Sequence, residues 1–197
     1  MSTESNHEFI NRVFSEARTH TSWLKDPVRD ESLKEIYDAM KWGPTSANLC
    51  PARFLFVKSP AEKEKLIPCL SPTNVDKVRS APVTAVIAYD IAFYEQVGKL
   101  FPHAPQYRDT FGKNPELAQT TAFRNGSLQG AYFILAARAL GFDCGPMSGF
   151  DNKKVDETFF AGTTWRSNFI CNIGHGDKGK LHPRLPRLDF EEACKIA

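Results

Sequence analysis

The chain has 197 residues, of which 42% are hydrophobic and 24% charged, and its formal net charge is +2. This length and composition suit one globular domain, and the near-neutral charge does not indicate a nucleic-acid or membrane-surface partner. The longest apolar run, residues 131–140, contains Arg138 and is too short to span a bilayer. The polar first eight residues do not resemble a secretory signal. We therefore expect a single domain over residues 1–197 that works in the cytoplasm.

Five cysteines are spread singly along the chain, without a C-x-x-C pair. This pattern argues against a zinc site and against a disulfide framework, and it suits a reducing compartment. Cys171 falls in a predicted core strand, whereas Cys50 and Cys144 fall in candidate site loops. No base is close to either loop cysteine in sequence, so a structural role is the better interpretation of both. The five histidines show no metal-ligand spacing, and we predict no metal site.

Hydrophobic periodicity predicts an amphipathic helix over residues 9–17 and a second helix from Asp30, as its N-cap, to Met40. The next elements are expected to be a strand at 54–57, a helix from Ser59 to about Leu70, a strand at 83–89, a long buried helix at 116–140 closed by Gly141, a short helix at 151–160 and a strand at 169–173. Residues 91–115 carry aromatic side chains among prolines and predict an irregular excursion that covers a site. Residues 178–197 predict a tail that packs against a partner. Helices and strands without regular βαβ spacing indicate an α+β fold.

Two polar loops stand out, at residues 41–53 and 144–151. The first places small hydroxyl and amide residues between two prolines, which suits a polar ring gripped along its edge. An ordinary connection between a helix and a strand is the alternative. The second loop contains Ser148, but its string Gly-Pro-Met-Ser-Gly lacks the G-x-S-x-G nucleophile elbow. The chain also has neither a G-x-G-x-x-G dinucleotide motif nor a P-loop.

Three further clusters carry polar chemistry. Arg18-Thr19-His20 and His182-Pro183-Arg184 each set a guanidinium beside an imidazole, a pair suited to phosphate oxygens. Asn74 and Lys77 put an amide and an ammonium one helical turn apart. Solvated or surface-paired side chains are the alternative for each cluster. The residues alone thus indicate a domain with a polar site assembled from scattered loops.

The order of these segments resembles the FMN-dependent nitroreductase family, and within it the branch of malonic semialdehyde reductases (3-hydroxypropanoate dehydrogenases) of pyrimidine breakdown. The matching strings are residues 17–20, 40–48, 121–125, 145–151 and 184–188. The resemblance implies a nitroreductase-like α+β fold with a central mixed sheet flanked by helices. It also implies a domain-wrapped homodimer, with two FMN sites at the interface that are each built from both chains.

Cofactor-binding residues follow from the same resemblance. It places Arg18, His20, His182 and Arg184 at the FMN phosphate, Pro44, Thr45 and Ser46 at the flavin of the neighbouring subunit, Asn74 and Lys77 at the pyrimidine edge, and Pro146, Met147, Ser148 and Gly149 along the flavin near N5. Thr19, Asn48 and Asn125 complete the predicted cofactor set. The chemistry of these groups agrees with the placement, since two arginines would neutralise a phosphate and a lysine would stabilise a reduced, anionic flavin.

The implied activity is that of an FMN-dependent NAD(P)H oxidoreductase with ping-pong hydride transfer. NADH or NADPH is the expected donor, and no side chain is required as a catalytic acid or base. The resemblance implies reduction of malonic semialdehyde to 3-hydroxypropanoate. A broad-specificity nitro or quinone reductase and a non-catalytic FMN-binding protein are the alternatives. Arg124, and after it Arg108, are the predicted partners of the substrate carboxylate, with a surface ion pair as the competing interpretation.

Overall fold

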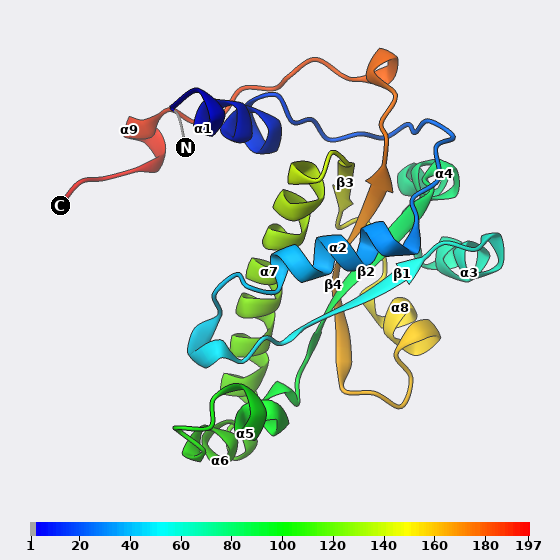
Figure 1. Cartoon of the computed structure of the whole chain (residues 1–197). Helices are drawn as coiled ribbons and strands as arrows, with labels where there is room; N and C mark the ends of the chain where they lie inside the picture. Colours follow the sequence, from blue (N-terminus) through cyan, green and yellow to red (C-terminus); the bar gives the residue numbers. More distant parts are fainter. Residues whose placement is uncertain (1–2) are drawn as a thin grey trace.

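A four-stranded antiparallel sheet lies at the centre of the computed structural model, which describes residues 3–197 (Figure 1). Its strands are β1 (Ala52–Val57), β2 (Val83–Asp90), β3 (Asp143–Met147) and β4 (Trp165–Gly174), in the spatial order β1-β2-β4-β3. The two inner strands pair from Val83 opposite Ile173 to Asp90 opposite Trp165. Every residue of β2 is buried, as expected for a strand that is covered on both faces.

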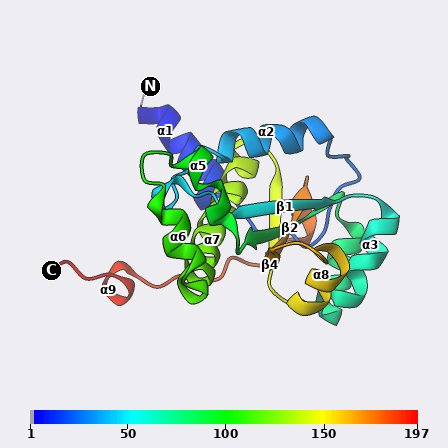
Figure 2. The same ribbon diagram turned by 90° about the horizontal axis from the view of Figure 1, so that it is seen from below.

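Helices cover both faces of this sheet. The α-helices are α1 (Thr3–Ile10), α2 (Asp30–Met40), α3 (Pro60–Leu66), α4 (Val75–Ser80), α5 (Val97–Leu100), α6 (Gln106–Gly112), α7 (Pro115–Ala139), α8 (Asn152–Phe159) and α9 (Phe190–Ala193). A π-helical turn, η1 (Asn11–Ser15), extends α1, and short 3₁₀ turns include η2 (Ser46–Asn48) and η4 (Pro72–Asn74). Figure 2 shows α2 and α7 on one side of the strands and α3 and α8 on the other.

The alternating side chains of β2 build a separate core on each face. Ala85 and Ile87 pack with Phe133 of α7 and with the buried stripe of α2. Val86 points to the opposite face, where side chains of α3, α4 and α8 surround it. A third apolar cluster joins α5, α6 and the first turns of α7 around Phe93. These packed layers fix the loops at the ends of the strands, from which the candidate site is assembled.

The α+β class is confirmed, and most predicted elements are present. The helix ending at Met40, the long helix and the strands around 83–89 and 169–173 agree with the periodicity. Gly141 closes α7 with φ +88°, the left-handed conformation expected of a residue that follows a helix.

Several expectations need correction. The sheet is antiparallel rather than mixed, and the one parallel contact among the described residues is an isolated bridge between Thr19 and Cys144. Asp30 is the first helical residue, with Arg29 at the cap position. The first helix begins at Thr3, six residues before the predicted start, and its π-helical extension ends at Ser15, two residues before the predicted end. Residues 93–112 are largely helical rather than irregular.

Strand β3 was not predicted, because its sequence Asp-Cys-Gly-Pro-Met contains glycine and proline, which are depleted in strands. It pairs with β4 on one side, and on the other side only the backbone of residues 19–20 approaches it. Proline is tolerated at such a margin of a sheet because its missing N–H falls outside the ladder. The second candidate loop is therefore half strand, and its last residues form the turn into α8.

The chain ends in an extended tail. From His182 to Ala197 every residue is exposed, and the tail runs past α1 and away from the body of the molecule (Figure 1, orange to red). Leu185 is 73% exposed and Leu188 is 69% exposed, so these apolar side chains have no core of their own chain to enter. Among residues 3–197, no helix combines the length and the apolar character needed to cross a membrane.

Candidate functional site

A basic groove of about 580 Å³ lies where the N-terminal segment, the end of α7 and the tail meet. Its lining residues are Phe14, Ser15, Ala17, Arg18, Thr19, Thr21, Arg138, His182, Pro183, Arg184, Leu185 and Arg187. The structure thus brings together the two predicted phosphate clusters, whose arginines are 166 positions apart in sequence. It adds Arg138 and Arg187, which sequence reasoning did not assign to the site.

Backbone carbonyls, rather than carboxylates, hold the arginines of this groove. Arg184 donates through Nη2 to the carbonyl oxygen of Ala17 at 3.1 Å, and Arg18 donates to the carbonyl oxygen of His182. Arg138 donates through Nη1 to the carbonyl oxygen of Val13 at 3.0 Å, and its buried Nε has no partner among the described residues. A carbonyl fixes a guanidinium without neutralising it, so the groove keeps positive charge and free donors for an anion.

His20 does not line the groove, although it neighbours Arg18 in sequence. It is only 4% exposed, and its Nε2 lies 3.4 Å from Oδ1 of Asp143. Burial lowers the pKa of His20, Asp143 opposes this shift, and the charges of Arg18 and Lys178 add to it. The position of His20 suits a neutral imidazole that packs beneath the groove and does not contact its ligand.

Asn74 and Lys77 form a second polar cluster where η4 enters α4. Lys77 Nζ donates to Asn74 Oδ1 at 3.0 Å, and Asn74 Nδ2 donates to the carbonyl oxygen of Gly149 at 3.0 Å. A Cβ at Gly149 would lie 2.7 Å from Asn74 Nδ2, so only glycine permits this approach. The buried Asn172 fixes the cluster from below, since its Nδ2 donates to the carbonyl oxygen of Lys77 at 2.9 Å.

Strand β3 connects the basic groove to this cluster. At its start, His20 N donates to the carbonyl oxygen of Cys144 at 3.1 Å, and just beyond its end Ser71 N donates to the carbonyl oxygen of Gly149 at 3.0 Å. Five residue steps separate the two ends, roughly 17 Å at the rise of a strand. Pro146, Met147 and Ser148 lie between them, and the first two are half-buried. A ligand with an anionic end and a polar ring could therefore contact both clusters while lying along β3.

The loop after α2 contains Pro44, Thr45, Ser46 and Asn48. It lies at the end of the sheet opposite to the basic groove (Figure 1). It joins α2 to the start of β1, and Asn48 Nδ2 donates to the carbonyl oxygen of Leu100 in α5 at 2.9 Å. Ser46 N donates to Asn125 Oδ1 at 2.8 Å. Within the described part of the chain, no hydrogen bond or ion pair joins this loop to the groove or to Asn74 and Lys77, so one chain does not bring all predicted cofactor residues together.

The two predicted substrate arginines differ in their surroundings. Arg108 is exposed and is held by Glu95, whose Oε2 lies 2.9 Å from Nε and 2.8 Å from Nη2. Arg124 is exposed on α7 and has no ion pair among residues 3–197. The competing interpretation, a surface ion pair, therefore describes Arg108 and not Arg124.

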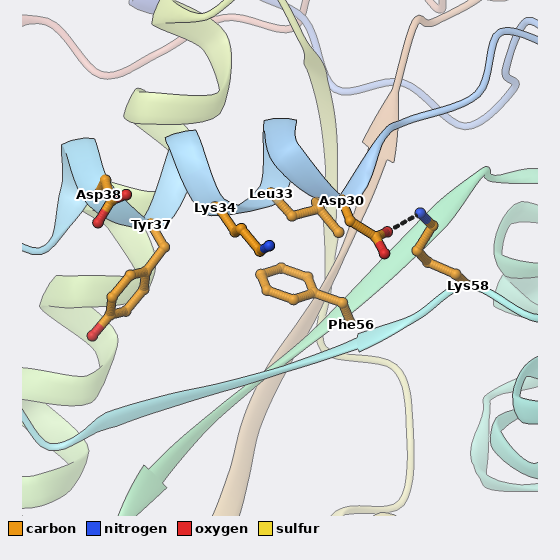
Figure 3. A pocket seen from close by; sticks show the side chains of 7 residues that line it. All are labelled: Asp30, Leu33, Lys34, Tyr37, Asp38, Phe56 and Lys58. Carbon is orange, nitrogen blue, oxygen red and sulfur yellow. Dashed lines mark hydrogen bonds and ion pairs between the residues drawn. The ribbon is translucent and has the colours of Figure 1, made fainter.

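A separate hollow of about 510 Å³ lies between α2 and the edge strand β1 (Figure 3). Leu33 and Phe56 form its apolar floor, Tyr37 stands at its side, and Lys58 pairs with Asp30 at its rim. None of the predicted site residues lines this hollow.

Apart from Asn125, sequence reasoning missed the residues of α7 that contact the basic groove and the loop after α2. Arg138 lines the groove, and Gln129 and Tyr132 bond to the loop after α2. A signal was available, because these three polar or amphipathic residues interrupt the otherwise apolar second half of the helix, residues 128–139. Buried polar groups require partners, so each such interruption marks a contact with another segment.

Comparison with known proteins places this architecture in context. The model of the Nitroreductase family matches residues 15–175. HadB of Ralstonia pickettii, a candidate NADH dehydrogenase/NAD(P)H nitroreductase, is 57% identical over 94% of this chain and 95% of its own length. A protein of the same description from Cupriavidus pinatubonensis is 54% identical over 97% of this chain and 98% of its own.

Solved structures share the fold at lower identity. The candidate nitroreductase ydfN of Bacillus subtilis superimposes with a TM-score of 0.85 at 22% identity, and the match covers both chains completely. A candidate nitroreductase from Exiguobacterium sibiricum, solved in complex with FMN, gives a TM-score of 0.84 at 19% identity over 96% of this chain and 97% of its own. At such identities the likeness concerns the fold.

Proposed function

Because the chain belongs to the Nitroreductase family, we propose that it is an FMN-dependent NAD(P)H oxidoreductase that works by a ping-pong cycle. The observation that carries this proposal is the groove of arginines, which have no carboxylate partner within the described part of the chain and are joined by β3 to the Asn74–Lys77 cluster. The relatives' names, which include NAD(P)H nitroreductase, support the same activity class. The FMN in the complex from Exiguobacterium sibiricum supports the cofactor.

The donor set of this chain fits FMN at both ends. Arg18 and Arg184 are already oriented by backbone carbonyls and keep free N–H groups for phosphate oxygens. The buried Nε of Arg138, which has no partner among the described residues, supports a donor capacity in the groove that those residues do not satisfy. At the other end, Asn74 and Lys77 offer an amide and an ammonium to a polar ring.

Bound FMN would supply the redox chemistry, accepting a hydride from the nicotinamide and passing it to the acceptor. The protein would bind FMN, orient its ring and tune its reduction potential. Lys77 would place positive charge beside the ring edge, where reduction adds negative charge. Asn74, held by Gly149, would fix the in-plane orientation of the ring. The half-buried segment of Pro146 and Met147 would shield one face of the ring, which leaves the other face for donor and acceptor in turn.

A homodimer completes this proposal. The loop with Pro44, Thr45 and Ser46 would reach the partner's flavin, which explains why one chain keeps the loop apart from the groove. Exposed apolar side chains support such a partner, since Phe9 is 53% exposed, Phe14 is 55% exposed and the tail is uncovered. Interfaces of this obligate kind bury upwards of about 2,000 Å². Light scattering should give twice the monomer mass of 22.1 kDa, and a monomer that retains FMN would contradict the proposal.

Malonic semialdehyde is the narrower substrate proposal, with reduction to 3-hydroxypropanoate in pyrimidine breakdown. Arg124 supports it, because this guanidinium, which has no ion pair among the side chains that the structure describes, is adjacent to Asn125, which bonds the loop that would reach the flavin. Broad nitro or quinone reduction is the second candidate, favoured by the descriptions of the relatives. Steady-state comparison of malonic semialdehyde with a neutral aldehyde of equal length separates them. A preference for the acid that Arg124→Ala abolishes supports the first, and equal turnover of both aldehydes removes it.

Flavin reduction tests the central proposal. Purified protein reconstituted with FMN should be yellow, and NADH or NADPH should bleach it under anaerobic conditions before an acceptor is added. Subsequent addition of a quinone or an aldehyde should restore the colour. A protein that binds FMN but stays oxidised with both donors would instead be a non-catalytic FMN-binding protein.

A further inference from the structure

The connection between α2 and β1 adopts a conformation that its sequence does not favour. Ala47, Asn48 and Cys50 have φ values of 47°, 53° and 42°, the left-handed region that side chains other than glycine rarely occupy. Such residues persist only where the surrounding structure determines their conformation. Three of them within four positions therefore indicate that other parts of the protein hold this loop.

One face of α7 holds it. Asn125 Oδ1 accepts from Ser46 N at 2.8 Å, Gln129 Oε1 accepts from Ala52 N at 2.9 Å, and Tyr132 donates its hydroxyl to the carbonyl oxygen of Pro44 at 3.0 Å. The three side chains are spaced i, i+4 and i+7, so they share one face of the helix. They grip the loop near its start, in its middle and at its end.

Both amides are buried as well as bonded to the loop. Asn125 is 3% exposed and Gln129 is 5% exposed. The second amide atom of Asn125, Nδ2, donates to the carbonyl oxygen of Thr121 at 2.9 Å. A buried amide is costly unless it is hydrogen-bonded, so loop and helix stabilise each other. Because Asn125 is almost completely buried, little of its side chain is accessible for direct contact with a ligand.

Further contacts limit the remaining freedom of the loop. The Tyr132 ring lies against Gly43, where a Cβ would come within 2.2 Å of it. Arg53 Nη1 donates to the carbonyl oxygen of Cys50 at 3.1 Å, and Cys50 N donates to Thr45 Oγ1 at 3.2 Å. With its inward groups engaged, the loop presents the exposed Ser46 to the outside.

We infer that Asn125, Gln129 and Tyr132 are positioning residues, which preform the loop 43–52 so that its outer face meets the cofactor without reordering. This inference rests on the proposed function, in which that loop completes the partner's FMN site. A loop that is ordered before binding avoids the conformational entropy that ordering would cost. The three side chains would therefore act on FMN affinity through the loop and not by contact.

Hydrogen exchange on the full-length protein, with and without FMN, tests whether the three side chains order the loop. In wild type, the amides of Ser46 and Ala52 should be protected even without flavin. Asn125→Leu should accelerate exchange at Ser46, and Gln129→Met should accelerate it at Ala52, because each replaces the acceptor with an apolar group of similar size. Gln129→Glu keeps an acceptor and should restore protection at Ala52. Equal exchange at both amides in all variants would overturn the inference.

FMN titration tests the functional half. Each apolar variant should weaken FMN binding by at least about fivefold and alter the visible flavin spectrum, since the loop no longer has its preset shape. Tyr132→Phe removes a single hydroxyl at the edge of the loop and should weaken binding by about 2- to 10-fold, so it remains informative if a core variant fails to fold. Gln119→Met is the matched control, because this amide of α7 bonds the Tyr89 hydroxyl at 2.7 Å instead of the loop.

The outcomes separate this inference from the proposed function. Wild type that binds no FMN would refute the proposed function. Wild type that binds FMN, together with Asn125→Leu and Tyr132→Phe variants that match the Gln119→Met control in affinity and spectrum, would refute the positioning role alone. Variants with a lower melting temperature but an unchanged FMN affinity and flavin spectrum would also refute it, because that result describes a purely structural contact.

Discussion

Arg184 and Ala17 are 167 positions apart in sequence, yet Nη2 of Arg184 lies 3.1 Å from the carbonyl oxygen of Ala17. The neighbouring Arg18 returns the contact by donating to the carbonyl oxygen of His182. Each basic segment thus orients its arginine on the backbone of the other. The pair forms only when both ends of the chain are in place, and it leaves both charges available to an anion.

Removal of either arginine should therefore weaken FMN binding. We expect Arg18→Ala and Arg184→Ala each to raise the FMN dissociation constant by about 10- to 150-fold, the effect of losing a charged hydrogen bond of about 1.5–3 kcal/mol. Riboflavin, which lacks the phosphate, should bind each variant much as it binds wild type. Fluorescence titration with both flavins measures the difference.

Arg79→Ala is the control for that experiment, since Arg79 is a surface arginine that pairs with Glu64 and Asp76 instead of lining the groove. It should retain the wild-type affinity for FMN. Equal losses of FMN and riboflavin affinity in the groove variants would show that these arginines do not recognise the phosphate.

Lys77 should tune the flavin rather than merely bind it. Replacing its ammonium by the neutral amide in Lys77→Gln removes the positive charge beside the ring edge, so reduction becomes less favourable. A loss of about 1.5–3 kcal/mol corresponds to a two-electron midpoint potential that is about 30–65 mV more negative. Spectroelectrochemical titration measures this shift. Lys153→Gln, on the outer surface of α8, should leave the potential unchanged.

His20 predicts a pH dependence of stability. Burial is the main cause that lowers its pKa below the ordinary 6.5, so the folded protein resists a proton that the unfolded chain accepts. The free energy of unfolding should be unaffected by His20 well above pH 6.5. It should decrease as the pH falls through 6.5, by up to about 1.4 kcal/mol per pH unit until the folded-state pKa is reached. Urea unfolding between pH 7.5 and 5.5 measures this slope.

His20→Gln should flatten the pH dependence, because the variant has no imidazole to titrate. His103→Gln replaces an exposed histidine and should keep the wild-type slope. If His20→Gln kept the same slope as wild type, the acid sensitivity would have to come from other groups.

Gly130 permits the close contact between α7 and the sheet. A Cβ there would lie 2.6 Å from the Phe169 ring and 3.3 Å from the Ile87 side chain. Although alanine favours a helix over glycine by about 1 kcal/mol, Gly130→Ala should destabilise the protein by about 1–3 kcal/mol, as overpacking does. Gly98→Ala, where the new methyl group meets nothing within 4 Å, should be neutral or slightly stabilising in the same denaturation experiment.

The sequence by itself determined the elements whose apolar residues repeat at a helical or strand period. Residues 30–40 are an example, because the buried side chains follow the helical spacing, and residues 83–89 are recognised instead from a continuous apolar run rich in β-branched residues. It also marked Arg18, Arg184, Asn74 and Lys77 as polar groups that a core could not explain. These inferences are local, since each depends on the order of neighbouring residues along the chain.

Only the tertiary structure decided which of these groups meet. Strand β3 exists because β4 offers it a ladder, which outweighs the poor strand propensity of Gly145 and Pro146. His20 is buried beside Asp143, although Arg18, two residues before it, lines the groove, because the hydrogen bond from His20 N to the carbonyl oxygen of Cys144 holds its backbone against β3. The grip of Asn125 on Ser46 spans 79 positions, a separation that only the packing of α7 against the loop can close.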